Sequence, residues 1–516
     1  MKNAKNSQLL LLLALFAACQ AAPAPVATPV RQLDLGALDA EVRRAMAVMD
    51  VPGLALAVVD RQGVVVAKGY GVRALGSDAL VDADTLFDIG SITKTFTATA
   101  VATVVDEGTL SWETTIAPHV PGFERDDPWV TQQFTLADAL SHRGGYLDVE
   151  YYGLRPDMSR EELLVRLRHV QRVAPFRTAF EYHNVLFALA AFVMEDVTHE
   201  RWAELVDARV LQPLGMTATR TQRDGIPASA NRAAPHELTQ DGMVLLPPSP
   251  WRDLDPIPAA GAILSSANDM AKWCLFQLHA GEPGVVPGLS PDTLRAMRTS
   301  HVSGVFDWFP KWGYGRQRAG YGLGWMVLDY RDDADQHVAH GGATAGMQAW
   351  MVVSPKHGYG IAMMTNAGWA GDCVHFAIAN WIHDRVLGLP TIDWTGDQLV
   401  PFRGAYEKWL REREPQLPRD TSVPPSLPLA RYAGSYDEPL LGPMVITLDG
   451  PALTVQLGIA KATAEHWGGD VFRIDWHDPN IWNGFITFDL DAAGVVKGLT
   501  FDDSMKSKFS RRADGR

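Results

Sequence analysis

The sequence has little cysteine. Three cysteines occur in 516 residues, at positions 19, 274 and 373. So few cysteines at such wide spacing exclude the disulfide framework of a small secreted domain. Cys274 and Cys373 are therefore predicted to act as small buried hydrophobic residues. Cysteine and histidine also do not occur at the spacing of a zinc site, so no metal is expected.

Runs of basic residues are also missing. Lysine and arginine total 46 against 60 acidic residues, which gives a formal net charge of −14. A surface of this sign repels nucleic acid, so no nucleic-acid partner is expected. The charge does not identify a substrate.

Several common catalytic motifs are absent. The chain contains no G-x-S-x-G elbow, no H-E-x-x-H sequence and no glycine-rich phosphate loop. The α/β-hydrolase, metalloprotease and nucleotide-binding interpretations therefore lack the residues they need. No cofactor is expected.

No hydrophobic run is long enough to cross a bilayer, which takes roughly 20 apolar residues. The run Leu9–Phe16 follows two lysines and precedes small residues ending at Cys19, which is typical of an export signal. We assign residues 1–22 to this signal. Cys19 also resembles a bacterial lipoprotein cleavage site, although Phe16 stands where leucine is usual. An exported protein is expected, either periplasmic or anchored to the membrane by a lipid on Cys19.

What is present is a globular composition with strands at both ends of a long region. The segments 54–59 and 64–69 predict a hairpin around Gly63, and 347–353 with 359–365 predict a second one. Apolar residues at helical spacing predict helices between them, including one from Ser91 to about residue 106. This pattern indicates an α+β domain over residues 34–386 whose sheet joins early and late segments.

The remaining chain changes character. Residues 387–427 are rich in proline and predict a linker that includes a short helix. Residues 428–512 contain short alternating runs separated by Asp/Gly turns, which predict a small antiparallel barrel or sandwich.

Ser91 and Lys94 are the first candidate catalytic pair. A serine at a helix start and a lysine three residues later lie on one face of the helix. The lysine can take the serine proton if its surroundings lower its pKa, and the N–H groups of the helix start can stabilise an oxyanion. Alone, this spacing also fits a serine at a helix start and an exposed lysine.

Two further groups can complete such a site. Tyr182 can share the serine proton, and Asn184 can bind a substrate amide and orient the lysine. A helix N-cap at Asn184 and a half-buried loop tyrosine are the alternatives. At positions 340–343, glycines allow close backbone approach, the N–H of Ala343 can join that of Ser91 in an oxyanion hole, and His340 can bind substrate or move a proton. A surface histidine at a glycine-rich strand entry is the alternative there.

Taken together, these motifs carry a family resemblance. Their order, 91–94, 182–184 and 340–342, is similar to that of the penicillin-binding and class C β-lactamase superfamily of serine hydrolases. The resemblance covers roughly residues 35–385, and residues 428–512 resemble the lipocalin-like domain of some members. Supporting stretches are Val51-Pro52-Gly53, Leu140-Ser141-His142, Pro213-Leu214-Gly215-Met216, Ala260-Gly261 with Asn268-Asp269, and Tyr321-Gly322-Leu323-Gly324-Trp325.

The resemblance implies a fold, an activity and roles for residues. It implies an antiparallel sheet flanked by helices, a helical subdomain, and acylation of Ser91. Lys94 and Tyr182 would then handle protons, while Asn184, His340, Gly342 and Ala343 would contact substrate. His340 stands where β-lactamases generally carry lysine, so the ammonium that holds a β-lactam carboxylate is missing.

Cleavage of amide or ester bonds in small or peptide substrates, of the D-amino-acid peptidase or esterase type, is the favoured hypothesis. A class C-like β-lactamase and a non-catalytic protein that binds peptidoglycan or peptides are the alternatives. A run of aromatic residues is expected in a loop that either lines the cleft or docks onto the fold: Phe306, Trp308, Phe309, Trp312 and Tyr314.

Overall fold

The computed structural model describes most of residues 27–512. The gaps are residues 148–154, 156, 224, 228–229, 248–256, 280–285, 305–308, 413–416, 479–480, 482 and 503–505. The proposed export signal with Cys19, as well as Phe306 and Trp308, therefore lies outside the described residues. Among the helices that are described, none is both long and apolar enough to cross a membrane.

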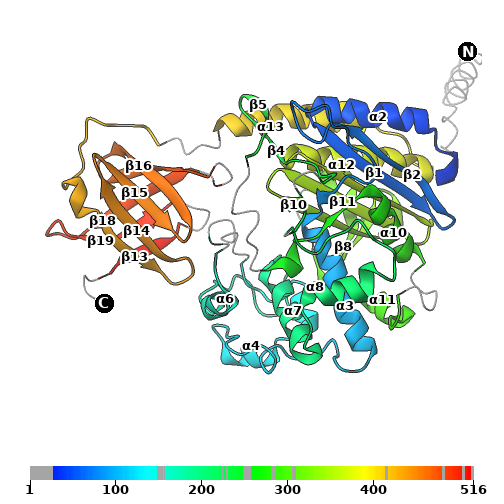
Figure 1. The fold of residues 1–516 in the computed structure, drawn as a ribbon, viewed down its shortest axis with the longest axis horizontal. Coiled ribbons are helices and arrows are strands. Elements are labelled where there is room, and N and C mark those ends of the chain that lie inside the picture. The colour runs from blue at the N-terminus through cyan, green and yellow to red at the C-terminus, as the bar shows by residue number, and fades with distance from the viewer. Residues whose placement is uncertain are drawn as a thin grey trace, which may run out of the picture.

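The first part of the chain, up to residue 412, forms what we call the sheet domain. Its centre is an eight-stranded antiparallel sheet in the order β2-β1-β12-β11-β10-β9-β8-β7 (Figure 1). The strands span β1 Gly53–Asp60, β2 Gly63–Gly71, β7 Val302–Ser303, β8 Tyr314–Tyr321, β9 Met326–Tyr330, β10 Asp333–Thr344, β11 Met347–Ser354 and β12 Tyr359–Thr365. Both predicted hairpins are confirmed, and pairing of β1 with β12 joins the early and late segments as expected.

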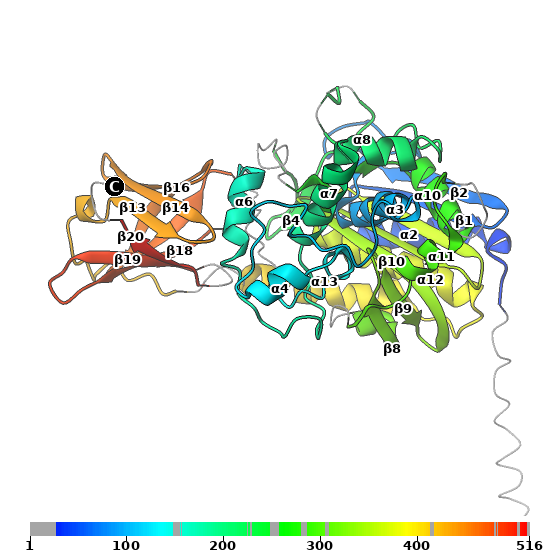
Figure 2. The same ribbon diagram turned by 90° about the horizontal axis from the view of Figure 1, so that it is seen from below.

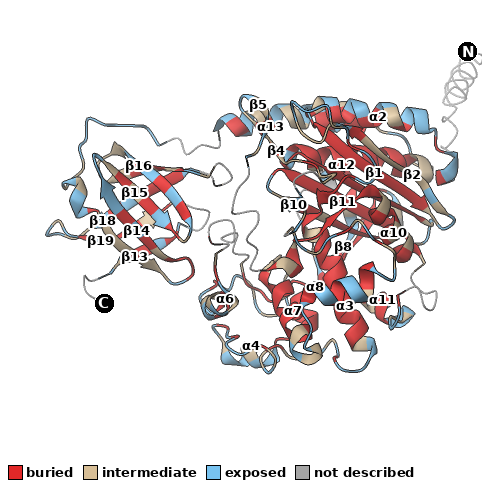
Figure 3. Ribbon diagram, viewed as in Figure 1, coloured by how far each residue is buried: buried red, intermediate tan, exposed pale blue. Residues whose placement is uncertain are grey.

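Both faces of this sheet are buried, as the continuous red of the central strands shows (Figure 3). Alternate residues of β1 enter two separate hydrophobic clusters: Leu54 and Leu56 pack with one, Ala55 and Ala57 with the other. Helices α2 (Leu35–Val48) and α12 (Trp369–Val386) cover the first face, and α10 (Ala267–Leu278) covers the second. This two-sided burial explains why these strands are apolar throughout rather than alternating.

A helical subdomain lies beside the sheet, below it in Figure 1. Its helices are α3 Thr93–Asp106, α4 Pro128–Gln133, α5 Leu136–Leu140, α6 Arg160–Leu167, α7 Val185–Thr198 and α8 Trp202–Val206. The helix α3 is buried on every side from Thr93 to Thr103, as expected of a central helix. It runs between the sheet and the subdomain, and its first residues point toward the strands.

The stretch predicted as a linker contains more regular structure than a single short helix. After α12, a π-helical turn (Trp394–Leu399) leads into α13 (Val400–Glu412). The side chains of Trp394, Leu399 and Leu410 are buried against α12 and α2. The apolar face of these residues binds the segment to the sheet domain despite its prolines.

The C-terminal part is a closed antiparallel barrel of eight strands, the first of the two folds expected there. Its strands are β13 Gly434–Glu438, β14 Gly442–Asp449, β15 Ala452–Leu457, β16 Ala460–Gly468, β17 Val471–Trp476, β18 Gly484–Leu490, β19 Val496–Phe501 and β20 Lys508–Arg511. Buried and exposed residues alternate along most of them, and small alanines of β16 lie opposite larger residues, as in the pair Ala462 and Trp476. The barrel and α6 lie next to each other (Figure 2). There the guanidinium of Arg166 donates to the carbonyl of Pro439 at 2.8 Å, and Arg155 donates to that of Leu441.

Candidate active site

Ser91 lies where the short strand β3 (Phe87–Asp88) turns into α3. A 3₁₀ turn, Gly90–Ile92, makes this connection, and Gly90 adopts a φ of +49°. Only glycine adopts this conformation without strain. The turn places Ser91 at the entrance of α3, so Lys94 follows one turn later on the same side of the helix.

The side chain of Lys94 is fully buried and contacts Ser91 directly. Its Nζ lies 2.8 Å from Ser91 Oγ, 2.6 Å from Asn184 Oδ1 and 2.9 Å from the carbonyl oxygen of Ala260. The exposed lysine considered from the sequence is therefore wrong. The contact with Ala260 comes from a separate segment, a 3₁₀ turn at Pro258–Ala260, which sequence spacing could not place here.

Tyr182 and Asn184 lie just before α7 in the chain. The Lys94 Nζ lies 4.9 Å from the centre of the Tyr182 ring, and the centre of the His142 ring lies 4.3 Å from that of the tyrosine. Asn184 stands at the start of α7, but its side chain makes no capping hydrogen bond there. Its oxygen instead accepts from Lys94, so the capping role is wrong.

The backbone of β10 touches the backbone of the Ser91 turn. A Cβ atom added to Gly342 would lie 1.9 Å from the carbonyl oxygen of Ile89 and 3.0 Å from the Ser91 nitrogen. One added to Gly90 would lie 2.5 Å from the Ala343 nitrogen. Two glycines thus permit the approach that brings the backbone nitrogens of Ser91 and Ala343 to one place. The sequence pointed to Gly342 but not to Gly90.

His340 is buried, so the surface histidine considered from the sequence is wrong. Its Nδ1 lies 2.6 Å from the carbonyl oxygen of Gly341 and its Nε2 lies 2.7 Å from the hydroxyl of Tyr321. Because a carbonyl only accepts, Nδ1 donates and Nε2 accepts from the tyrosine. Burial is the main cause that lowers the pKa of His340 to about 3. The ring is neutral at physiological pH.

Ser91 opens into a cavity of about 290 Å³. Its lining residues are Ser91, Tyr182, Phe309, Met326, His340, Gly341, Gly342, Ala343, Gln348, Trp350, Trp369 and Asp372. Sequence analysis singled out about half of these. The others come from β9, β11 and the first turn of α12, where apolar neighbours make each of them resemble a core residue.

The aromatic run before Tyr321 divides between the two roles considered for it. Phe309 lines the cavity. Trp312 stacks on Phe376 of α12 at 5.6 Å, and Tyr314 begins strand β8 rather than lying in a loop. The latter two therefore dock this segment onto the sheet domain.

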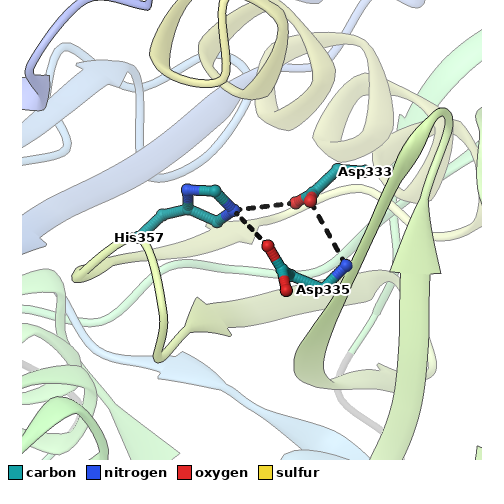
Figure 4. Close-up of side chains that lie close together, drawn as sticks. All are labelled: Asp333, Asp335 and His357. Atoms are coloured by element: carbon teal, nitrogen blue, oxygen red, sulfur yellow. Dashed lines mark hydrogen bonds and ion pairs between the residues drawn. The ribbon is translucent and has the colours of Figure 1, made fainter.

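A second group of polar residues lies at the other end of β10. Asp333, Asp335 and His357 bring one ligand atom each within 4.8 Å of one another (Figure 4). His357 Nε2 lies 3.0 Å from Asp333 Oδ2, and the Lys356 ammonium lies 2.6 Å from Asp335. The set is of the type that binds a divalent cation, but these hydrogen bonds and ion pairs already account for its arrangement.

Several known proteins are similar to this chain. Residues 38–372 match the Beta-lactamase family, and residues 418–513 match a domain of unknown function, DUF3471. An unguisins hydrolase from Aspergillus violaceofuscus (strain CBS 115571) is 29% identical over 472 residues, covering 85% of this chain and 82% of its own. Penicillin-binding protein 4 of Amycolatopsis lactamdurans is 30% identical over 325 residues, 62% of this chain and 82% of its own.

The same architecture occurs in a solved structure. The octameric penicillin-binding protein homologue from Pyrococcus abyssi superposes with a TM-score of 0.60 at 20% identity, over 93% of this chain and 100% of that one. At this identity the likeness establishes the fold. The family match covers most of the sheet domain. The chain therefore belongs to the Beta-lactamase family of serine hydrolases, and it carries a C-terminal barrel.

Proposed function

We propose that this protein acylates Ser91 and cleaves amide or ester bonds of small or peptide substrates, as a D-amino-acid peptidase or esterase. The observation that carries the proposal is the 2.8 Å contact between Lys94 Nζ and Ser91 Oγ at the wall of a cavity. The names of the relatives, a hydrolase of unguisins and a penicillin-binding protein, support a substrate of this kind.

Lys94 acts as the base in this proposal. Burial disfavours the charged form of a lysine, so a neutral amine can accept the proton as Ser91 Oγ attacks the acyl carbon. Tyr182, next to Lys94, passes the proton to the leaving amine or alcohol as its bond to the acyl carbon breaks. A water molecule then attacks the acyl carbon, and its proton passes through the same groups to Ser91 Oγ. The bond between Oγ and the acyl carbon breaks, and the acid is released.

Two backbone donors stabilise the negative oxygen of each tetrahedral intermediate. The N–H groups of Ser91 and Ala343 are brought together by the contact between Gly342 and Ile89. Such preorganised donors are worth about 10²–10³ in rate each when measured by removal. Asn184 keeps Lys94 oriented through its 2.6 Å hydrogen bond.

The test is covalent labelling of the full chain with a fluorophosphonate, followed by peptide mass mapping. We expect one label, on Ser91, and none in Ser91→Ala. The Lys94→Ala variant should lose nearly all labelling while keeping its fold by circular dichroism. Lys311→Ala, which removes a lysine that does not line the cavity, is the matched control and should label at the normal rate.

The alternatives separate in one substrate panel. Nitrocefin, p-nitrophenyl butyrate and D-alanyl-D-alanine peptides are compared on a single preparation. Faster turnover of nitrocefin than of the other two substrates would favour a β-lactamase. Because His340 is neutral, we expect slower turnover of nitrocefin than of the ester or the peptide. Peptide binding without turnover or labelling would favour a non-catalytic binding protein and contradict the proposal.

We also propose that residues 1–22 direct export and that Cys19 receives a lipid. The mature N-terminus tests this: mass spectrometry should find a chain that begins at a lipid-modified Cys19. In Cys19→Ala, the protein should leave the membrane fraction. A mature chain that retains residue 1 would contradict export.

A further inference from the structure

Asp372 places a carboxyl group in the wall of the cavity that contains Ser91. It lies in the first turn of α12 and lines the cavity with Trp369, three residues earlier on the same face of the helix. Helix α12 packs in the hydrophobic cluster on one face of the sheet, and α3, which follows Ser91, packs in the cluster on the other face. Ser91 and Asp372 therefore reach the cavity from different layers of the fold. The roles proposed above for Ser91, Lys94 and Tyr182 make no use of this carboxyl group.

The carboxyl group of Asp372 has no partner among the described residues. Neither a hydrogen bond nor an ion pair to it is found there, whereas the buried carboxylates of Asp88, Asp138 and Asp384 each have an arginine partner. No lysine or arginine is among the residues that line the cavity, and the one histidine that does, His340, is neutral. The lining residues thus offer no cation to balance a negative charge on Asp372, and a cationic ligand can supply it.

The walls around this carboxyl are aromatic. Phe309, Trp350 and Trp369 all line the cavity, and the Phe309 and Trp350 rings pack edge to face at 5.8 Å. Trp369 is 48% exposed although it borders the cavity. Aromatic faces attract cations through the ring quadrupole, and a carboxylate adds a full charge at the same place. A carboxyl group and aromatic rings that line the same cavity are suited to bind an organic ammonium group.

We propose that Asp372 and the surrounding aromatic rings bind a protonated amino group of the substrate, so that the cavity selects cationic acyl compounds over anionic ones. This inference rests on the proposed function for the position of the scissile bond. It narrows the substrate class to amides or esters that carry a free amine. It also disfavours a substrate with a free carboxylate, since Asp372 would repel that group and no lining cation would attract it.

Two measurements on the full chain test the proposal. The first compares kcat/KM for alanine p-nitroanilide, with a free amine, against its N-acetyl and N-succinyl forms, for both enantiomers. We expect the order cationic, neutral, anionic. In Asp372→Asn the ratio of cationic to neutral kcat/KM should fall about tenfold or more, and in Asp372→Lys the anionic form should become the preferred one. Asp292→Asn, which removes an exposed carboxylate on helix α11 (Pro291–Met297), should keep the original ratio.

The second measurement needs no turnover. Titration calorimetry on Ser91→Ala compares 3-phenylpropylamine, the uncharged 3-phenylpropanol and the anionic 4-phenylbutyrate. The amine should bind at least tenfold more tightly than the other two, and the double variant Ser91→Ala/Asp372→Asn should lose this preference. Equal binding of all three, or a preference that survives Asp372→Asn, would overturn the inference. If Ser91 takes no fluorophosphonate while the amine preference holds, the proposed hydrolysis fails and the ammonium site stands.

Discussion

The sheet domain and the barrel have different interiors. Side chains that can carry charge are buried throughout the sheet domain, among them Lys94, Asp138, His142, His183 and His340. Within the described part of the barrel, Ser507 is the only buried polar residue other than tyrosines. The barrel interior is filled by apolar rows such as Met444 and Ile446.

This difference means that the sheet domain carries a cost in folding free energy that the barrel does not. Buried polar groups cost free energy unless partners or a change of protonation compensate for them. Lys94 is held by three oxygen atoms, whereas His340 stays neutral. The described part of the barrel buries no lysine, arginine, histidine or carboxylate side chain and contributes none of the residues that line the cavity. The residues proposed to carry the function therefore all lie in the sheet domain.

Two glycine substitutions with comparable steric clashes give the largest expected effect. A Cβ on Gly342 would lie 1.9 Å from the Ile89 oxygen, and one on Gly498 in β19 of the barrel would lie 2.3 Å from the Phe509 oxygen. Gly342→Ala should reduce kcat by about 100-fold or more because it separates the two backbone donors. Gly498→Ala should destabilise the barrel and leave Ser91 labelling unchanged. Equal losses of labelling in both variants would mean that the barrel takes part in catalysis.

Acid should unfold the sheet domain before the barrel. Burial lowers the pKa of His183, His340 and His375 to about 3. Between pH 6.5 and 3 these histidines are protonated in the unfolded chain but neutral in the folded one. The free energy of unfolding therefore falls as the pH drops from 6.5 toward 3. The loss should be on the order of 1–3 kcal/mol for each histidine at pH 4.

Hydrogen exchange at pH 4, resolved by peptide, measures this order of unfolding. Peptides from α7 and α12 should lose protection while those from β14 to β18 keep it. His375 is one of these three histidines and does not line the cavity. In His375→Gln, the acid transition of the sheet domain should therefore move to lower pH. A barrel that opens first would contradict the comparison between the two interiors.

The smallest expected effect is a gain in stability. Burial raises the pKa of Asp372 to about 7. The unfolded state releases the proton near pH 4 but the folded state holds it until about 7, so folding is disfavoured progressively across that window and fully above it. Asp372→Asn should stabilise the sheet domain by on the order of 1–4 kcal/mol at pH 8 and by nothing below pH 4. Thermal unfolding at the two pH values measures the difference, and an equal change at both would mean that packing rather than charge is responsible.

Local patterns predicted much of the fold. Both hairpins, the helix after Ser91 and the C-terminal β domain follow from periodicity and turn residues, which act over a few neighbouring positions. Strand β8 was missed, and the short helix expected in the linker is the longer, packed helix α13. Tyr314 and Leu410 belong to these elements because of partners far away in the chain, and single-chain patterns contain no record of such partners.

The sequence by itself determined which residue types could form the site: a serine and a lysine one helical turn apart, a tyrosine, an asparagine and a glycine-rich strand. Their grouping into three motifs pointed to the family before any contact was known. Only the tertiary structure decided that Ala260 holds Lys94, that His340 is buried and neutral, and that Asp372 faces the cavity. The physical reason is that burial sets the protonation of a side chain and long-range packing sets the direction in which it points. Both depend on residues that are distant in the sequence.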